Sequence, residues 1–157
     1  MENISNGNSG ERLPQNKMML AEALRSGNID PEVRPFLKRF FVLPITPTES
    51  CYGHPEKGSM PYISYVQDDV YDEQTNANNT RFLTECETQL AGRINAHLKN
   101  PWVVIHVETE SYGSGPQVHT IHFSIDDCEV YEKHGEVILK TIWEAVLDTI
   151  DTYFNTS

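Results

Sequence analysis

The stretch WVVIHVETESYGSGPQVHTIHFSID, residues 102–126, decides the fold. Apolar and polar residues alternate in both of its halves, and residues 112–116 between them contain two glycines and a proline, which are typical turn residues. Alternation with a period of two is typical of a strand that buries one face. We therefore expect residues 102–110 and 117–126 to form a β-hairpin.

Helical periodicity flanks this hairpin on both sides. Before it, a helix beginning at Asn79 or Thr80 would place apolar residues every three or four positions until Pro101 forces it to end: Leu83, Cys86, Leu90, Ile94 and Leu98. After it, residues 136–154 repeat the pattern, and the helix is expected to begin between His134 and Glu136. We expect this last helix to lie across one face of the sheet.

The first half of the chain gives weaker signals. Helices are expected over residues 15–26 and 31–40, the second capped by Asp30 with Pro31 at its first position. Residues 41–45 and 62–66 are expected to be strands, the first at an edge because of Pro44. Most of residues 46–78 is polar and is expected to be a long loop.

The order of these elements predicts an α+β fold, with an antiparallel or mixed sheet of about four strands packed against helices. At 157 residues the chain has the length of one ordinary domain. We expect one domain over residues 15–157, preceded by a disordered tail over residues 1–14, which is rich in Asn, Ser and Gly.

The net charge of −11 is confined to one part of the chain. Residues 1–59 carry seven acidic and seven basic side chains, whereas residues 60–157 carry sixteen acidic and five basic ones. Nucleic-acid binding needs clustered Lys and Arg, so direct binding of DNA or RNA by this part is disfavoured. The same field attracts basic proteins, although acidity can also serve solubility alone.

Targeting and redox signals are weak. The sequence contains no run of about 18 apolar residues that would cross a membrane and no signal peptide at its start, so a cytoplasmic location without membrane contact is expected. The three cysteines, Cys51, Cys86 and Cys128, are odd in number and widely spaced, which suggests reduced thiols. A homo-oligomer is possible on this sequence.

The histidines of the hairpin are the candidate catalytic or metal-binding residues. If Val103 pairs with Phe123 and Ile105 with Ile121, His106 lies opposite Thr120 and diagonal to His122. Glu108 and Ser124 would share that face. Two imidazoles and a carboxylate suit zinc or non-haem iron, or acid–base chemistry with Ser124 nearby. Half-exposed sheet histidines more often hydrogen-bond only to neighbours, and a slip of one residue would separate the set.

Other signatures are absent. Cys51 and His54 have the C-x-x-H spacing of some zinc sites, but no second pair accompanies them, so chance explains it better. The common nucleotide-binding, hydrolase and metalloprotease motifs are missing. We therefore expect no cofactor and no metal, and an enzyme is the less favoured class.

The long polar segment is the candidate binding surface, because it interleaves tyrosines with carboxylates. Tyrosine is common at binding hot spots, and nearby carboxylates select a partner that bears Arg and Lys. An ordinary solvated loop is the equally weighted alternative. The candidate partner-binding residues are Tyr62, Tyr65, Asp68, Asp69, Tyr71, Asp72 and Glu73.

Two functional hypotheses follow from these observations. The first is a small acidic, non-enzymatic protein that binds a basic protein surface, as an inhibitor, an immunity-type or anti-defence factor or a dedicated chaperone would. The alternative is a small hydrolase or metal-dependent enzyme that uses His106, His122 and Glu108. A structural subunit of a larger assembly is a third possibility.

Overall fold

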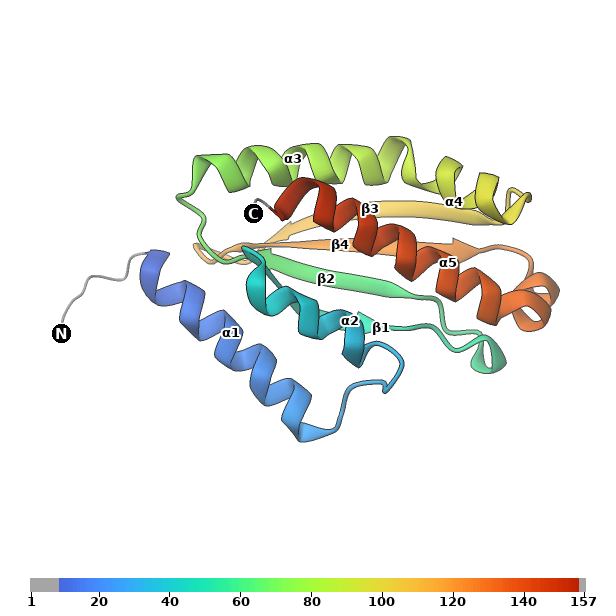
Figure 1. Cartoon of the computed structure of the whole chain (residues 1–157), viewed down its shortest axis with the longest axis horizontal. Coiled ribbons are helices and arrows are strands. Elements are labelled where there is room, and N and C mark those ends of the chain that lie inside the picture. The colour runs from blue at the N-terminus through green and yellow to red at the C-terminus, as the bar shows by residue number, and fades with distance from the viewer. Residues whose placement is uncertain (1–8, 156–157) are drawn as a thin grey trace.

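The structure, a computed structural model, describes residues 9–155 (Figure 1). Its helices are α1 (Ser9–Ser26), α2 (Arg34–Lys38), α3 (Glu73–Thr88), α4 (Leu90–Leu98) and α5 (Cys128–Phe154), with short 3-10 helices η1 (Arg39–Val42) and η2 (Pro55–Lys57). Its strands are β1 (Ile45–Cys51), β2 (Tyr62–Gln67), β3 (Val103–Ser111) and β4 (Gln117–Ile125). The predicted α+β class is confirmed, and so is the sheet of four strands.

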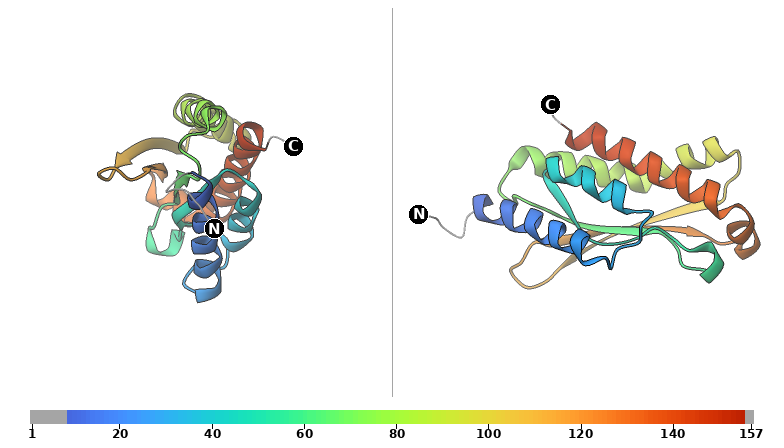
Figure 2. Two further views of the ribbon diagram at one scale, coloured as in Figure 1. Left: turned by 90° about the vertical axis from the view of Figure 1, so that its left-hand side faces the viewer. Right: turned by 60° about the horizontal axis from the view of Figure 1, so that its bottom comes forward.

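The four strands form one antiparallel sheet in the order β1-β2-β4-β3, so β1 and β3 are its edges. Helix α5 runs across one face, as predicted, and the α3–α4 pair packs beside it and against β3 (Figure 1). Helix α2 lies on the same side, while α1 packs along β1. Seen along the sheet, the helices gather on one side, and among residues 9–155 no helix covers the other side of β4 and β3 (Figure 2). Near the end of β2, α1 borders Val66.

Helix α5 begins at Cys128, earlier than the predicted start between His134 and Glu136. The carboxylate of Asp127 caps it by accepting from the backbone N–H groups of Glu129 and Val130. The later start was expected because an earlier one would place Glu132 in the buried stripe. Instead Tyr131 is buried one position earlier and Glu132 is exposed, so the extra turns add to the core without burying a charge.

The β3–β4 hairpin forms, but its predicted register is wrong by two residues. Val103 lies opposite Ile125 and Ile105 opposite Phe123. In the observed register the last pair joins Ser111 to Gln117, which leaves Pro116 outside the ladder. Because proline has no N–H to donate, a register that leaves Pro116 unpaired loses no ladder hydrogen bond. A shift by two keeps every side chain on its predicted face.

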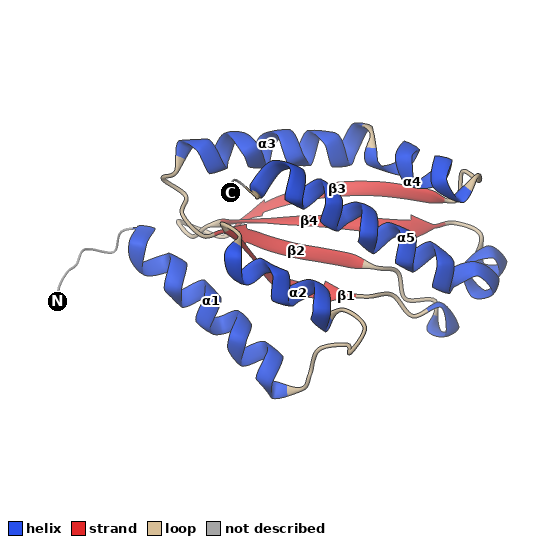
Figure 3. Cartoon of the chain, in the orientation of Figure 1, coloured by secondary structure: helices blue, strands red, loops and turns tan. Residues whose placement is uncertain are grey.

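Residues 41–45 are not the predicted strand. Phe41 and Val42 belong to η1, and β1 begins only at Ile45, after Pro44. The carbonyl of Pro44 accepts from the backbone N–H of Asp68, which ties this corner to the end of β2. Residues 46–78 are therefore not a long loop, since they contain most of β1, all of β2 and the start of α3 (Figure 3).

The helix predicted to open at Asn79 or Thr80 begins at Glu73 and is interrupted at Gln89. Asp72 caps α3 by accepting from the N–H groups of Gln74 and Thr75. The first turns of α3 bury Thr75, Asn78 and Asn79, which are polar, so hydrophobic periodicity did not reveal them.

The N-terminal segment also departs from the prediction. Residues 1–8 of the expected tail lie outside the described residues, and α1 begins at Ser9 instead of Gln15. Helix α2 begins at Arg34 with Val33 as its cap residue, so Asp30 does not cap it through its carboxylate. No helix within residues 9–155 has the length and apolar character needed to cross a bilayer.

Candidate functional site on the open face of the sheet

Two of the predicted partner-binding residues lie in the interior. The Tyr65 ring is 2% exposed and its hydroxyl donates to Asn79 Oδ1. Asp68 is 0% exposed and its Oδ2 forms an ion pair with Lys17 Nζ at 2.9 Å. Neither side chain can contact a partner docked on the surface.

Asp68 instead anchors α1 to the sheet. Its Oδ1 accepts from Asn16 at 2.9 Å and from the Thr46 hydroxyl at 2.7 Å. Lys17 Nζ also donates to the carbonyls of Phe40 and Ile45, at 2.7 and 2.8 Å. Burial lowers the pKa of Lys17, and the hydrogen bond and charge of Asp68 act in the opposite direction.

The other predicted loop residues do not form one surface with Tyr62. Asp69 accepts from the backbone N–H of Tyr71 at 2.9 Å, and Asp72 caps α3, so both carboxylates stabilise local backbone. Tyr71 and Glu73 are exposed, Glu73 in the first turn of α3. Tyr62 begins β2, at the end of the strand away from these residues.

A row of rings crosses the open face of the sheet. Tyr62 of β2 lies opposite His122 of β4, and His122 lies opposite His106 of β3. The ring centroids of Tyr62 and His122 are 6.1 Å apart, and those of His122 and His106 are also 6.1 Å apart. The three rings therefore form a continuous platform on three adjacent strands.

Glu108 joins the two imidazoles. Its Oε1 lies 2.9 Å from His122 Nε2, and its Oε2 lies 3.6 Å from His106 Nε2. The hydrogen bond with His122 is the main cause that holds the pKa of Glu108 below its usual range. The side chain of Glu108 remains 51% exposed.

The next row across the sheet has a glutamate at each end. Glu49, Ser64, Thr120 and Glu108 are successive partners across the four strands, and the hydroxyls of Ser64 and Thr120 are 2.7 Å apart. The bulge between Pro47 and Glu49 sets which residues of β1 share this row.

A third glutamate reaches the same face near the hairpin turn. Glu110 lies two residues beyond Glu108 and accepts from the Tyr112 hydroxyl at 3.0 Å. That hydrogen bond is the main cause that raises the pKa of Tyr112, and Glu49 adds to the same shift.

The open face is acidic, and its histidines are exposed, whereas Ser64 and Thr120 in its middle row are buried. The four strands contain three glutamates, Glu49, Glu108 and Glu110, and no Lys or Arg. The side chains of His106 and His122 are 69% and 43% exposed. Of the residues predicted for partner binding, only Tyr62 belongs to this face. Sequence reasoning missed Glu49, Glu110 and Tyr112, because only the strand register shows that they share a side.

The predicted His106, His122 and Glu108 set does come together, in a different register from the expected one. His106 lies directly opposite His122 instead of opposite Thr120. Ser124 lies opposite Val104, one row farther along β4, so it faces neither imidazole directly. All three members of the set are solvent-exposed by more than a third.

A different group of side chains has its possible metal-ligand atoms close together. Among the described residues, Asp30, Cys51 and His54 are the group whose ligand atoms all lie within 4.8 Å of one another. The C-x-x-H spacing of Cys51 and His54 was the available sequence signal. The third member, Asp30, comes from a separate segment and could not be recognised from spacing.

Comparison of the chain with protein-family models, with curated proteins and with solved structures gave no match.

Proposed function

We propose that the protein is a non-enzymatic binding protein whose open sheet face docks on a basic surface of a protein partner. The observation that carries this proposal is the composition of the face: Glu49, Glu108 and Glu110 lie among partly or fully exposed rings, and the strands that build the face contain no Lys or Arg. An acidic inhibitor or a dedicated chaperone is the class of protein that such a face suits.

The charge of the face selects the partner. Carboxylates that no lysine or arginine of the sheet neutralises attract guanidinium and ammonium groups and repel phosphates. A basic protein surface is therefore favoured over a nucleic acid. The hydrogen bond with His122 lowers the pKa of Glu108, so this carboxylate favours its charged form further.

The rings supply contact area beside the charges. Tyr62, His122 and His106 form a platform on which an arginine side chain can stack, while the flanking glutamates accept its N–H groups. Aromatic residues with two side-chain torsions lose little entropy on binding. The glutamates of the face thus attract a basic partner electrostatically, and the rings provide a site where one of its cationic side chains can stack.

The test compares two variants of equal charge. The face variant carries Glu49→Gln, Glu108→Gln and Glu110→Gln. The control variant removes three exposed carboxylates from helices α3 and α5, with Glu87→Gln, Glu132→Gln and Asp148→Asn. Each has a formal net charge of −8, three less negative than the parent value of −11. Any difference between them then reflects the place of the charges.

Each protein is immobilised and used to capture partners from an extract of its host at low and moderate salt, and retained proteins are identified by mass spectrometry. Affinity for a captured basic partner is then measured with purified proteins. The face variant should bind roughly three- to a hundredfold more weakly than the control variant, since exposed charge pairs each contribute modestly. Equal binding by both variants, or no basic partner at either salt concentration, would contradict the proposal.

A second candidate function is supported by the contact of Glu108 with both imidazoles. In this alternative, His106, His122 and Glu108 form a small hydrolytic or metal-dependent site. Its exposure argues against it, because catalytic sites gain strength from excluding water. Esterase and phosphodiesterase assays on the parent and on His122→Ala decide the matter: turnover that the variant loses would favour the enzyme.

A further inference from the structure

Three side chains from separate segments converge beside the end of β1. The ligand atoms of Asp30, Cys51 and His54 all lie within 4.8 Å of one another, and His54 Nε2 is 3.1 Å from Asp30 Oδ2. We propose that these residues bind one transition-metal ion, and that Zn²⁺ is the ion their donor atoms suit best. This inference goes beyond the proposed function and does not depend on it.

The local backbone explains how each ligand reaches the site. Cys51 is the last residue of β1, and His54 follows in a turn that is closed by a two-way backbone bridge to Ser59. Asp30 comes from the connection between α1 and α2. Its Oδ2 accepts from the backbone N–H of Tyr52 at 3.3 Å, which orients the carboxylate toward the Cys51–His54 turn.

The turn is held in place by α5. Gly53 has a φ of +104°, and a Cβ at this position would lie 2.7 Å from Leu139 Cδ2 and 2.8 Å from the Tyr131 hydroxyl oxygen. Trp143 Nε1 donates to the carbonyl of Tyr52 at 3.0 Å. The residues between Cys51 and His54 are therefore fixed by the packed core, so the ligands are held close together before an ion binds.

A second contact with α5 fixes the far side of the turn. Pro55 lies so close to Gly135 that a Cβ on this glycine would be 2.2 Å from Pro55 Cγ. The Tyr131 hydroxyl donates to the carbonyl of Ser59 at 2.6 Å. A preformed site of this kind loses little conformational entropy on binding an ion.

The donor atoms indicate the class of metal. Thiolate sulfur, imidazole nitrogen and carboxylate oxygen are the ligands of Zn²⁺, at about 2.3, 2.0–2.1 and 2.0–2.2 Å. Tetrahedral bonds of these lengths place neighbouring ligand atoms roughly 3.3–3.7 Å apart. Only small side-chain movements separate the observed arrangement from that geometry. Ca²⁺ and Mg²⁺ prefer sets of oxygen ligands, and this site offers a thiol and an imidazole.

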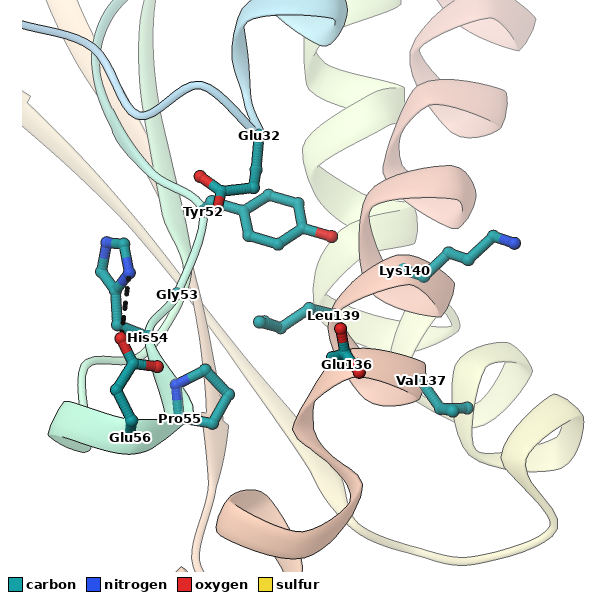
Figure 4. Close-up of a pocket in the computed structure, with 10 residues that line it drawn as sticks. All are labelled: Glu32, Tyr52, Gly53, His54, Pro55, Glu56, Glu136, Val137, Leu139 and Lys140. Atoms are coloured by element: carbon teal, nitrogen blue, oxygen red, sulfur yellow. Dashed lines mark ion pairs between the residues drawn. The ribbon is translucent and has the colours of Figure 1, made fainter.

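The other nitrogen of His54 also has the environment of a metal ligand. With Nε2 facing Asp30, Nδ1 faces the carboxylate of Glu56, whose Oε2 is 3.8 Å away, beyond hydrogen-bond distance (Figure 4). A carboxylate hydrogen-bonded to the second ring nitrogen orients a ligating imidazole and raises its basicity. A small movement of the exposed Glu56 side chain would form that hydrogen bond, so we assign Glu56 as a positioning residue for the proposed site.

Space for the ion and for a fourth ligand lies next to these residues. A cavity of about 390 Å³ is lined by Asp30, Cys51 and His54 together, with Glu49 and Ser50 at its wall. On its other side, His54 borders a second cavity of about 530 Å³, between the turn and α5 (Figure 4). Three protein ligands and an accessible fourth position are the arrangement of zinc sites that take water or an external ligand.

The test uses untagged full-length protein that has been treated with a chelator and freed of it. Co²⁺ serves as a spectroscopic substitute for Zn²⁺, because thiolate coordination produces a charge-transfer absorption band. We expect one equivalent of Co²⁺ to bind with this band, Zn²⁺ to displace it, and Zn²⁺ to raise the melting temperature. Absence of the band, or Co²⁺ binding that does not saturate at one equivalent, overturns the proposal.

Variants assign the ligands. Cys51→Ser should abolish the band, and Asp30→Asn should weaken Zn²⁺ binding, whereas Cys128→Ser, which removes an exposed thiol elsewhere, should leave both unchanged. Glu56→Gln should lower Zn²⁺ affinity about 10–100-fold and retain the band. Circular dichroism controls for folding. A band that persists in Cys51→Ser, or that is lost in Cys128→Ser, would refute the assigned site.

Discussion

Replacement of Lys17 by methionine tests the structural role assigned to Asp68. The change removes the cation that lies 2.9 Å from the Asp68 carboxylate, which is fully buried. Lys17 Nζ is the charge partner of Asp68 Oδ2. The variant also leaves the carbonyls of Phe40 and Ile45 without the hydrogen bonds that Lys17 donates.

The expected cost is large because a buried charge loses its partner. Removing one member of a buried ion pair costs about 3–5 kcal/mol. For a domain of this size each kcal/mol lowers the melting temperature by about 2–4 °C, so a decrease of roughly 6–20 °C is expected. Lys38→Met, which removes an exposed cation from α2, should change the free energy of unfolding by less than about 0.5 kcal/mol.

Urea unfolding followed by circular dichroism measures the effect, with an unchanged m-value as the check that the denatured state is unaltered. Adding Asp68→Asn to Lys17→Met should recover about 1 kcal/mol or more, because the amide keeps an Oδ1 acceptor for Thr46 and carries no charge. The reasoning would be refuted if Lys17→Met were as mild as Lys38→Met.

Three further predictions concern the core and the thiols. Gly53→Ala should be far more destabilising than Gly58→Ala in urea unfolding, since both glycines have positive φ but only the first would place its Cβ against Leu139 and Tyr131. Burial lowers the pKa of His119 from 6.5, so the unfolded state binds the proton first and the free energy of unfolding should fall as the pH decreases below about 6.5. His119→Gln should lose less stability than the parent protein between pH 7.5 and 5.5. An unchanged pH dependence of stability in this variant would contradict the assignment. Burial raises the pKa of Cys86 to about 12, so a thiol reagent should label the exposed Cys128 in native protein and Cys86 only after unfolding.

The hairpin and the last helix were predictable because each depends on a periodic pattern. Alternation assigned the strand faces correctly, so His106, Glu108 and His122 were expected on one side. It could not fix the absolute register, because a shift by two residues preserves every face. The observed register leaves Pro116 outside the ladder.

The polar segment was misjudged because its burial depends on partners distant in sequence. Asp68 is buried with Lys17, 51 residues earlier, and Tyr65 is buried with Asn79 on α3. No local pattern distinguishes these residues from exposed ones such as Tyr71. Tyrosine and carboxylates come together instead on the open face, where β1, β2 and β3 supply Glu49, Tyr62, Glu108 and Glu110.

The Asp30, Cys51 and His54 group illustrates the same limit for a site. Two members were visible as a C-x-x-H pair, and the third was interpreted as a helix cap. In the structure α2 begins four residues after Asp30, which directs its carboxylate to the Cys51–His54 turn. Only the fold brings the three side chains together.

The most direct measurement of the docking proposal is a two-dimensional amide NMR titration of the protein with a captured basic partner, or with a peptide from its cationic surface. We expect the shifts to concentrate on the open face, at Tyr62, His106, Glu108 and His122, and to weaken with added salt. Shifts confined to the solvent side of α5 or to residues 69–73, with the open face unchanged, would contradict the proposal.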